Sequence, residues 1–225
     1  MIEIRNIDIY GWESAIRGMR NPMNSWDRSD SDCKTIIRDN GKYVEDFIGD
    51  NDLALMKSLV KAGSDHSKFM RMINVTMDIT APLYWWKEFD TYKVGTVRNS
   101  CSTMHKIADK KFDITDFSYE HLRDRSLFLL REVIQELNLW REIYNNGYPP
   151  ESGCEAIEPE KKEVWWQMIQ LLPSSYNQRA TVQLNYEVLA NMYKSRKEHK
   201  LDEWREFCKE IEKLPYFMDI IGGNQ

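Results

Sequence analysis

The chain has 225 residues, of which 42% are hydrophobic and 30% charged. These proportions are ordinary for a soluble globular protein, and the length fits a single domain, 1–225, with a sizeable core. A formal net charge of −5 gives no general attraction to nucleic acid or to an anionic membrane, so neither is expected as a partner.

The sequence carries no signal for export or membrane insertion, and no common catalytic motif. No apolar run of signal-peptide length opens the chain and no apolar stretch reaches eighteen residues, which favours a cytoplasmic protein. The four cysteines are Cys33, Cys101, Cys154 and Cys208. They are far apart and form no C-x-x-C pair, so neither a metal site nor a disulfide framework is expected. P-loop, G-x-G-x-x-G and G-x-S-x-G patterns are also absent from the sequence.

The beginning of the chain predicts a strand, a short helix and a polar loop. Ile4 lies between charged residues in an alternating pattern, and a second apolar phase starts at Ile7. A short helix is expected over 12–20. The loop is expected over 21–32, where Asn, Ser and Asp are frequent.

A helix and the clearest strand of the sequence follow. Asp52 is placed to cap a helix that Gly63 ends. The strand is marked by apolar residues that share one face of a period-two pattern, namely Phe69, Ile73, Val75, Met77 and Ile79. Pro82 then opens a short aromatic helix, and past Lys93 the residues indicate a polar loop.

The rest of the chain is predominantly helical. The longest helix ends at Gly147. Its candidate caps are Thr115, Asp116 and Ser118. Beyond a Pro- and Gly-containing loop from Tyr148 to Pro159, further helices are expected over 159–172, over 179–196 and from Asp202 onward. Few strands and many helices indicate an α+β fold with a small central sheet and flanking helices.

The expected helix over 179–196 places two polar residues on an apolar face. Asn185 and Arg196 lie eleven residues apart, about three helical turns, so both project from one side. The apolar stripe between them consists of Val188, Leu189 and Met192. A buried arginine needs an anionic partner. That partner is either an internal carboxylate such as Glu88 or Asp90, or a bound anion, and the sequence leaves both open.

The spacing of several motifs resembles one enzyme family over most of the chain, from His66 to the last helix. Ala81-Pro82 follows the strand, and the stretch from Lys87 to Met104 runs in the frame of R-Q-x-x-R-H-R-x-x-S-x-N-E-x-S-G-R-Y. Downstream, Leu172-Pro173 and the N-x-x-x-x-x-N-x-x-x-x-R spacing of 185–196 also match. These motifs resemble the flavin-dependent thymidylate synthases, also called thymidylate synthase complementing proteins.

The resemblance implies a set of site residues. The positions that hold the flavin cofactor carry Thr91, Tyr92, Lys93, Asn185 and Asn191. The positions that hold the uracil nucleotide carry Glu88, Ser102, Thr103 and Arg196. Most arginines of the family are replaced here, at a cost of about 2–3 kcal/mol for each lost charge-assisted bond. Lys93, Arg98 and Arg71 offer cations from new positions.

The resemblance also implies a fold, a reaction and an assembly. The reaction is FAD-dependent reductive methylation of dUMP to dTMP with methylene-tetrahydrofolate, without an enzymic nucleophile. The family assembles as a homotetramer whose sites lie between subunits, and the same assembly is expected here, with an altered active site. Two alternatives stay open. One is a non-catalytic relative that keeps the oligomeric nucleotide-binding scaffold, and the other is a flavoprotein that acts on another substrate.

Overall fold

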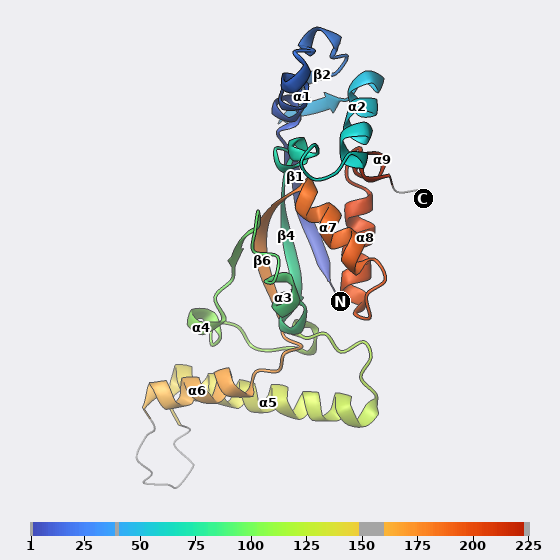
Figure 1. Cartoon of the computed structure of the whole chain (residues 1–225). Helices are drawn as coiled ribbons and strands as arrows, with labels where there is room; N and C mark the ends of the chain where they lie inside the picture. The colour runs from blue at the N-terminus through green and yellow to red at the C-terminus, as the bar shows by residue number, and fades with distance from the viewer. Residues whose placement is uncertain (1, 39–40, 149–159, 223–225) are drawn as a thin grey trace. The chain divides into compact units, whose positions relative to one another are not determined.

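A computed structural model describes residues 2–38, 41–148 and 160–222, with side chains described outside 33–46. Four strands form a sheet in the order β1 (Glu3–Tyr10), β4 (Asn74–Pro82), β6 (Asn177–Asn185) and β5 (Val97–Ser100). A separate antiparallel pair consists of β2 (Asp32–Arg38) and β3 (Gly41–Phe47), with Asp32 opposite Phe47. The predicted α+β class is therefore confirmed (Figure 1).

The chain divides into two compact units. The first contains Met1–Glu3, Ile79–Thr91 and Asn99–Ala180, and the second contains Ile4–Asp78, Tyr92–Arg98 and Thr181–Gln225. Apart from the boundary between Thr91 and Tyr92, the boundaries fall within the strands of the four-stranded sheet, so each of its strands contributes residues to both units.

β4 confirms the strand that the period-two pattern predicts. Val75, Met77 and Ile79 are buried, and the residues between them are half-buried. Phe69 and Ile73 do not belong to the strand, because Phe69 lies in the 3-10 turn η3 (Lys68–Arg71) and Ile73 directly precedes β4. Pro82 is the N-cap of α3 (Leu83–Phe89), which confirms the short aromatic helix.

β6 corrects the predicted helix over 179–196. Its alternate residues Gln178, Ala180, Val182 and Leu184 are buried. This period of two overrides the local helix preference, because one face of the strand is covered. The helix, α7 (Tyr186–Arg196), starts only after Asn185, and its apolar stripe of Val188, Leu189 and Met192 is buried as predicted.

The second unit contains β1 from Ile4 onward and α1 (Trp12–Arg20), the strand and the helix that the pattern predicts. Asn6 has φ 51°, in the left-handed region. It lies between Ile4 and Ile7, where the apolar residues of β1 change from even to odd positions. Gly11, with φ +100°, precedes α1. A Cβ there would lie 2.1 Å from the carbonyl oxygen of Met72, so only glycine fits at this position.

The other helices of the second unit are α2 (Asp50–Lys61), α8 (Asp202–Glu212) and α9 (Phe217–Ile221). The N-cap of α2 is Gly49, so the prediction that Asp52 caps this helix is wrong. Its carboxylate is fully buried and accepts hydrogen bonds from side chains elsewhere in the unit. Between Arg20 and β2, the predicted loop contains the short 3-10 turns η1 (Asn21–Met23) and η2 (Trp26–Arg28).

The first unit contains α3, α4 (Thr103–Lys106), α5 (Asp124–Asn146) and α6 (Lys161–Leu171). Figure 1 shows α5 and α6 side by side. The N-cap of α5 is Arg123, so none of the three predicted caps holds it, and Asp113 instead caps the preceding turn η4 (Ile114–Asp116). Gly147 ends α5 with φ 80°, as predicted. The loop from Tyr148 to Pro159 lies almost wholly outside the described residues.

Candidate functional site

Arg196 lies at the centre of a group of aromatic and polar side chains in the second unit. Its Nε donates a hydrogen bond of 3.0 Å to the hydroxyl of Tyr92. Its guanidinium carbon lies 4.8 Å from the ring centroid of Trp204 and 5.6 Å from that of Tyr92. Nη1 lies 2.9 Å from Nε2 of His199. Arg196 is only half-buried, so these contacts fix the direction of the guanidinium and leave part of it accessible.

The segment 92–98 runs along α7 and touches both ends of the helix. Tyr92 contacts Arg196 at the C-terminal end. At the N-terminal end, a Cβ on Gly95 would lie 3.0 Å from Nδ2 of Asn185 and 3.1 Å from Val188. Gly95 has φ +75°, a backbone conformation that favours glycine, and the close approach of the two side chains adds to this preference. Asn185 and Arg196 therefore face the same segment, even though Asn185 precedes the helix.

Asn185 and Asn191 have different surroundings. The amide oxygen of Asn185 accepts from the backbone N–H of Val188 and caps α7. Asn191 is exposed and lines a cleft of about 530 Å³. The polar part of the cleft wall also includes Ser64, Ser67, Glu187, Lys194 and Lys197. Asn185 thus has a structural role as a cap, while Asn191 is available to a ligand.

An ion pair between Arg71 and Glu187 lies at this cleft, which Glu187 lines. Arg71 donates to Glu187 through Nε (2.6 Å) and Nη2 (3.0 Å), a bidentate arrangement. The hydrogen bond and the charge of Glu187 raise the pKa of Arg71. Arg71 is therefore already neutralised by an internal carboxylate, which makes it a poor substitute for a ligand-binding arginine.

The remaining residues at flavin positions offer little to a pyrophosphate. The hydroxyl of Thr91 donates to the backbone oxygen of Glu88 at 2.7 Å, within the first unit. The hydroxyl of Tyr92 is engaged by Arg196. Lys93 is exposed. These three positions supply one cation, and that cation lacks the planar fork of arginine, so they do not fit FAD in the manner of three basic side chains.

The expected nucleotide residues of the first unit lie in helices α3 and α4 or at the start of α4. Ser102 caps α4 by accepting from the backbone N–H of His105 at 3.2 Å, and Thr103 is the first residue of that helix. Glu88 is half-buried near the end of α3. The predicted site residues thus fall into two groups. Tyr92, Lys93, Asn185, Asn191 and Arg196 belong to the second unit, and Glu88, Thr91, Ser102 and Thr103 belong to the first.

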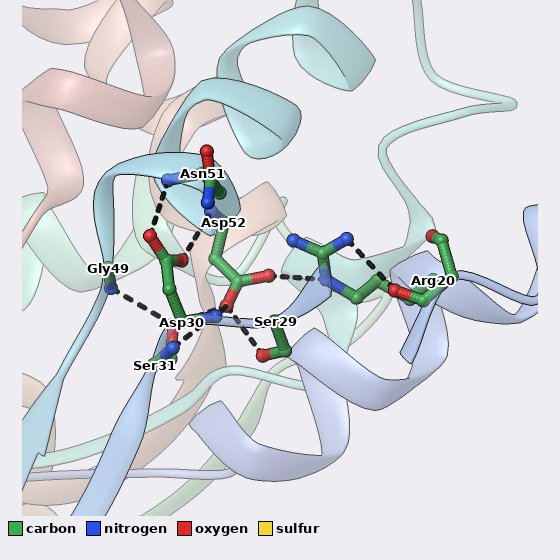
Figure 2. A network of polar contacts seen from close by, with 8 residues as sticks. Arg20, Ser29, Asp30, Ser31, Gly49, Asn51 and Asp52 are labelled. Carbon is green, nitrogen blue, oxygen red and sulfur yellow. Dashed lines mark hydrogen bonds and ion pairs between the residues drawn. The ribbon is translucent and has the colours of Figure 1, made fainter. Parts of the chain in front are cut away.

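A buried polar network in the second unit is absent from the sequence predictions (Figure 2). Asp52 accepts from Nε of Arg20 at 2.6 Å and from the hydroxyls of Ser29 and Ser31 at 2.7 and 2.6 Å. Burial alone raises the pKa of Asp52, but the hydrogen bonds from Ser31, Ser29 and Arg20 outweigh it and hold the pKa below its usual value. The dense run of Ser and Asp over 29–32 is the only sequence signal for this network.

The network also caps α2 from outside the helix. The carboxylate of Asp30 accepts from the backbone N–H groups of Asn51 (2.9 Å) and Asp52 (3.1 Å). Gly49, the N-cap residue, has no side chain for this task, and a Cβ there would lie 2.2 Å from Cγ of Asp30. Asp30 thus supplies the acceptor that the predicted cap, Asp52, does not.

Neither a metal site nor a membrane span is found in the described part of the chain. Within those residues, no group of three or more His, Cys, Asp or Glu side chains is placed to hold a metal ion. None of the described helices is long and apolar enough to cross a membrane.

The fold is that of the flavin-dependent thymidylate synthases. Two solved structures of thymidylate synthase X (ThyX) from Helicobacter pylori, both with FAD and dUMP, match with a TM-score of 0.63. They share 15% and 14% sequence identity with this chain, cover 98% and 97% of it, and are themselves covered to 97%. No model of a protein family matches the sequence, and neither does any curated protein. The likeness is therefore one of fold.

Proposed function

We propose that this chain binds a uracil nucleotide on a flavin-dependent thymidylate synthase-like fold whose active site is altered. The main support is the match of fold over nearly the whole chain to structures that contain FAD and dUMP. The residue that we assign to the nucleotide is Arg196. The resemblance gives this sequence position to a nucleotide-binding arginine, and the contacts of its guanidinium with Tyr92 and Trp204 support the assignment.

The altered chemistry is proposed from the residues at the cofactor positions. FAD, when bound to a protein of this fold, supplies the hydride for reductive methylation. Thr91 and Tyr92 already bond within the chain, and Lys93 is a lone exposed cation. We therefore propose that nucleotide binding is retained and that the standard methylation of dUMP is not.

A second candidate is an active thymidylate synthase that uses other cations. Lys194 and Lys197 line the same cleft as Asn191, so two positive side chains are available next to a residue at a cofactor position. Formation of dTMP from dUMP, methylene-tetrahydrofolate and a reduced flavin, or rescue of a thymidine-requiring strain, would establish this candidate and reject the first.

We further propose that the protein is a cytoplasmic homotetramer. The support is the resemblance together with apolar side chains that α5 leaves exposed in one chain. These are Phe128, Leu129 and Leu139, with exposed fractions of 58%, 53% and 48%. Apolar surface on one long helix is typical of a face that a second subunit covers.

The nucleotide assignment predicts a graded loss of dUMP affinity at Arg196. Arg196→Lys keeps the charge and loses the planar fork, so affinity should fall about tenfold. Arg196→Ala should weaken binding about a hundredfold and cost about 1–2 kcal/mol of stability, because the stacking on Trp204 is lost. Calorimetric titration with dUMP and thermal melts measure both effects.

Arg17, which is exposed and pairs with Glu13 at 3.5 Å, gives the matched control. Arg17→Ala should leave dUMP affinity unchanged. If dUMP does not shift the melting temperature of the unmodified protein and Arg196→Ala melts far below it, Arg196 serves the fold and the nucleotide proposal is wrong.

The cofactor positions predict weak FAD binding. Two lost charge-assisted contacts, at about 1.5–3 kcal/mol each, correspond to a loss of at least a hundredfold in affinity. Thr91→Arg should recover part of it, whereas Lys57→Arg, at an exposed position of α2, should not. Titration of the protein with FAD, followed by flavin fluorescence, tests this. Tight stoichiometric binding by the unmodified chain would contradict the proposed altered site.

A further inference from the structure

The second unit contains a cavity of about 1090 Å³ that no predicted site residue lines. It is enclosed by α1, the turns η1 and η2, α2 and η3. Its apolar wall is formed by Met19, Leu55, Leu59, Phe69 and Met72. A cavity of this size with a mainly apolar wall is typical of sites for small organic molecules.

Arg20 gives this cavity a fixed hydrogen-bond donor. The residue is only 4% exposed. Its Nε donates to Asp52, and its Nη1 donates to the backbone oxygen of Ser25 at 3.1 Å. Among the described residues, none accepts a hydrogen bond from Nη2. Figure 2 shows the guanidinium held from two sides in this way, which leaves Nη2 as an unused donor on a residue that lines the cavity.

The charged side chains that line the cavity are mainly positive. Arg28 and Lys68 are basic, Asp65 is acidic, and His66 is also present. The charge of Arg20 is balanced by Asp52. The lining therefore has a net positive charge of one without counting His66, which favours an anionic group over a cationic one.

We propose that this cavity binds an organic anion with an aromatic or other apolar body. The apolar body occupies the wall formed by the helices, and a carboxylate or phosphate group accepts from Nη2 of Arg20 and approaches Arg28 and Lys68. Because Asp52, Ser29 and Ser31 hold the guanidinium before any ligand arrives, this donor needs no rearrangement on binding. The site is separate from the proposed nucleotide site at Arg196, and neither assignment depends on the other.

Three naphthalene derivatives of nearly equal size test the chemical class. They are 1-naphthoate, 1-naphthalenemethanol and 1-naphthylmethylammonium, each titrated into the full chain by calorimetry. We expect saturable binding of one naphthoate per chain, with at least tenfold weaker binding of the alcohol and weaker binding still of the cation. If naphthoate does not bind saturably, or the cation binds as tightly as the anion, the proposal is wrong.

Two variants locate the bound anion. Ala54 is exposed on α2 and lines the cavity, so Ala54→Trp fills it from a position that tolerates a large side chain. This variant should abolish binding of all three probes. The double variant Arg28→Ala, Lys68→Ala should weaken naphthoate about tenfold and leave the neutral alcohol unchanged.

The control is Arg17→Ala, which removes an exposed charge from α1 outside this cavity. It should leave all three affinities unchanged. Naphthoate binding that survives Ala54→Trp would show that the anion binds elsewhere and would overturn the assignment. Titration of each variant with dUMP reports separately on Arg196, so failure of one proposal is distinguished from failure of the other.

Discussion

Replacing Asp52 with alanine is expected to lower the free energy of unfolding by about 3–5 kcal/mol, because it leaves a buried arginine without its counter-charge. The carboxylate is fully buried and the Arg20 side chain is 5% exposed. The same change removes the acceptor of the Ser29 and Ser31 hydroxyls. Chemical denaturation measures the effect. A loss below about 1 kcal/mol would show that water or a rearranged side chain replaces the carboxylate.

An exposed ion pair provides the control for this change. Asp219 lies 3.8 Å from Lys57, and its side chain is 60% exposed. Asp219→Ala should change stability by less than about 1 kcal/mol, as is usual for surface pairs. The difference between the two alanine variants therefore reports the contribution of burial.

The pH dependence of this effect follows from the lowered pKa of Asp52. Since the pKa in the folded protein lies below that of the unfolded chain, about 3.9, the network contributes its full stability above that pH. The contribution is lost as the pH falls through the lower folded-state pKa. Asp52→Asn should therefore be most destabilised relative to the unmodified protein near neutral pH. The difference in free energy of unfolding between the two proteins should become smaller in acid.

The sequence predicts the elements whose local pattern and tertiary surroundings agree. Val75, Met77 and Ile79 alternate in the sequence and are buried in β4. Pro82 and Gly147 mark the ends of helices through their backbone preferences alone. In these places no distant residue is needed to decide the structure.

The prediction from sequence fails where contacts with residues far away in the chain determine the local structure. Arg179 and Gln183 are good helix formers, yet they lie in β6, because Ala180, Val182 and Leu184 are covered on one face. Asp52 is of a residue type that often caps helices, but its side chain pairs with Arg20, thirty-two residues earlier. Neither outcome is visible in a short window of sequence, because the deciding residue lies far away in the chain.

In the candidate site, too, the sequence predicts the local features and misses the contacts with residues far away in the chain. Spacing alone identified Arg196 as a residue with an unusual environment and placed Asn185 on the same side. It did not identify the groups that hold the guanidinium, because Tyr92 lies more than a hundred residues earlier and Trp204 belongs to the next helix. Whether a nucleotide also contacts Arg196 stays a prediction for the dUMP titration.

Replacing Trp204 with alanine should cost about 3–5 kcal/mol of stability and also weaken dUMP binding. The ring is fully buried and packs edge-on against Phe207 at 5.7 Å, so its removal leaves a large cavity. The same ring lies under the guanidinium of Arg196. Its loss frees the guanidinium to adopt other rotamers, and dUMP affinity should therefore fall about tenfold.

Trp204→Phe separates the two effects, because it keeps an aromatic face under Arg196 while it reduces the buried volume. We expect it to lose about 1–2 kcal/mol of stability and to bind dUMP nearly as tightly as the unmodified protein. Trp166→Ala in α6, where the ring is 41% exposed, serves as the control and should leave dUMP affinity unchanged. Normal dUMP affinity in a folded Trp204→Ala variant would show that the stacking on Trp204 does not position Arg196 for the nucleotide.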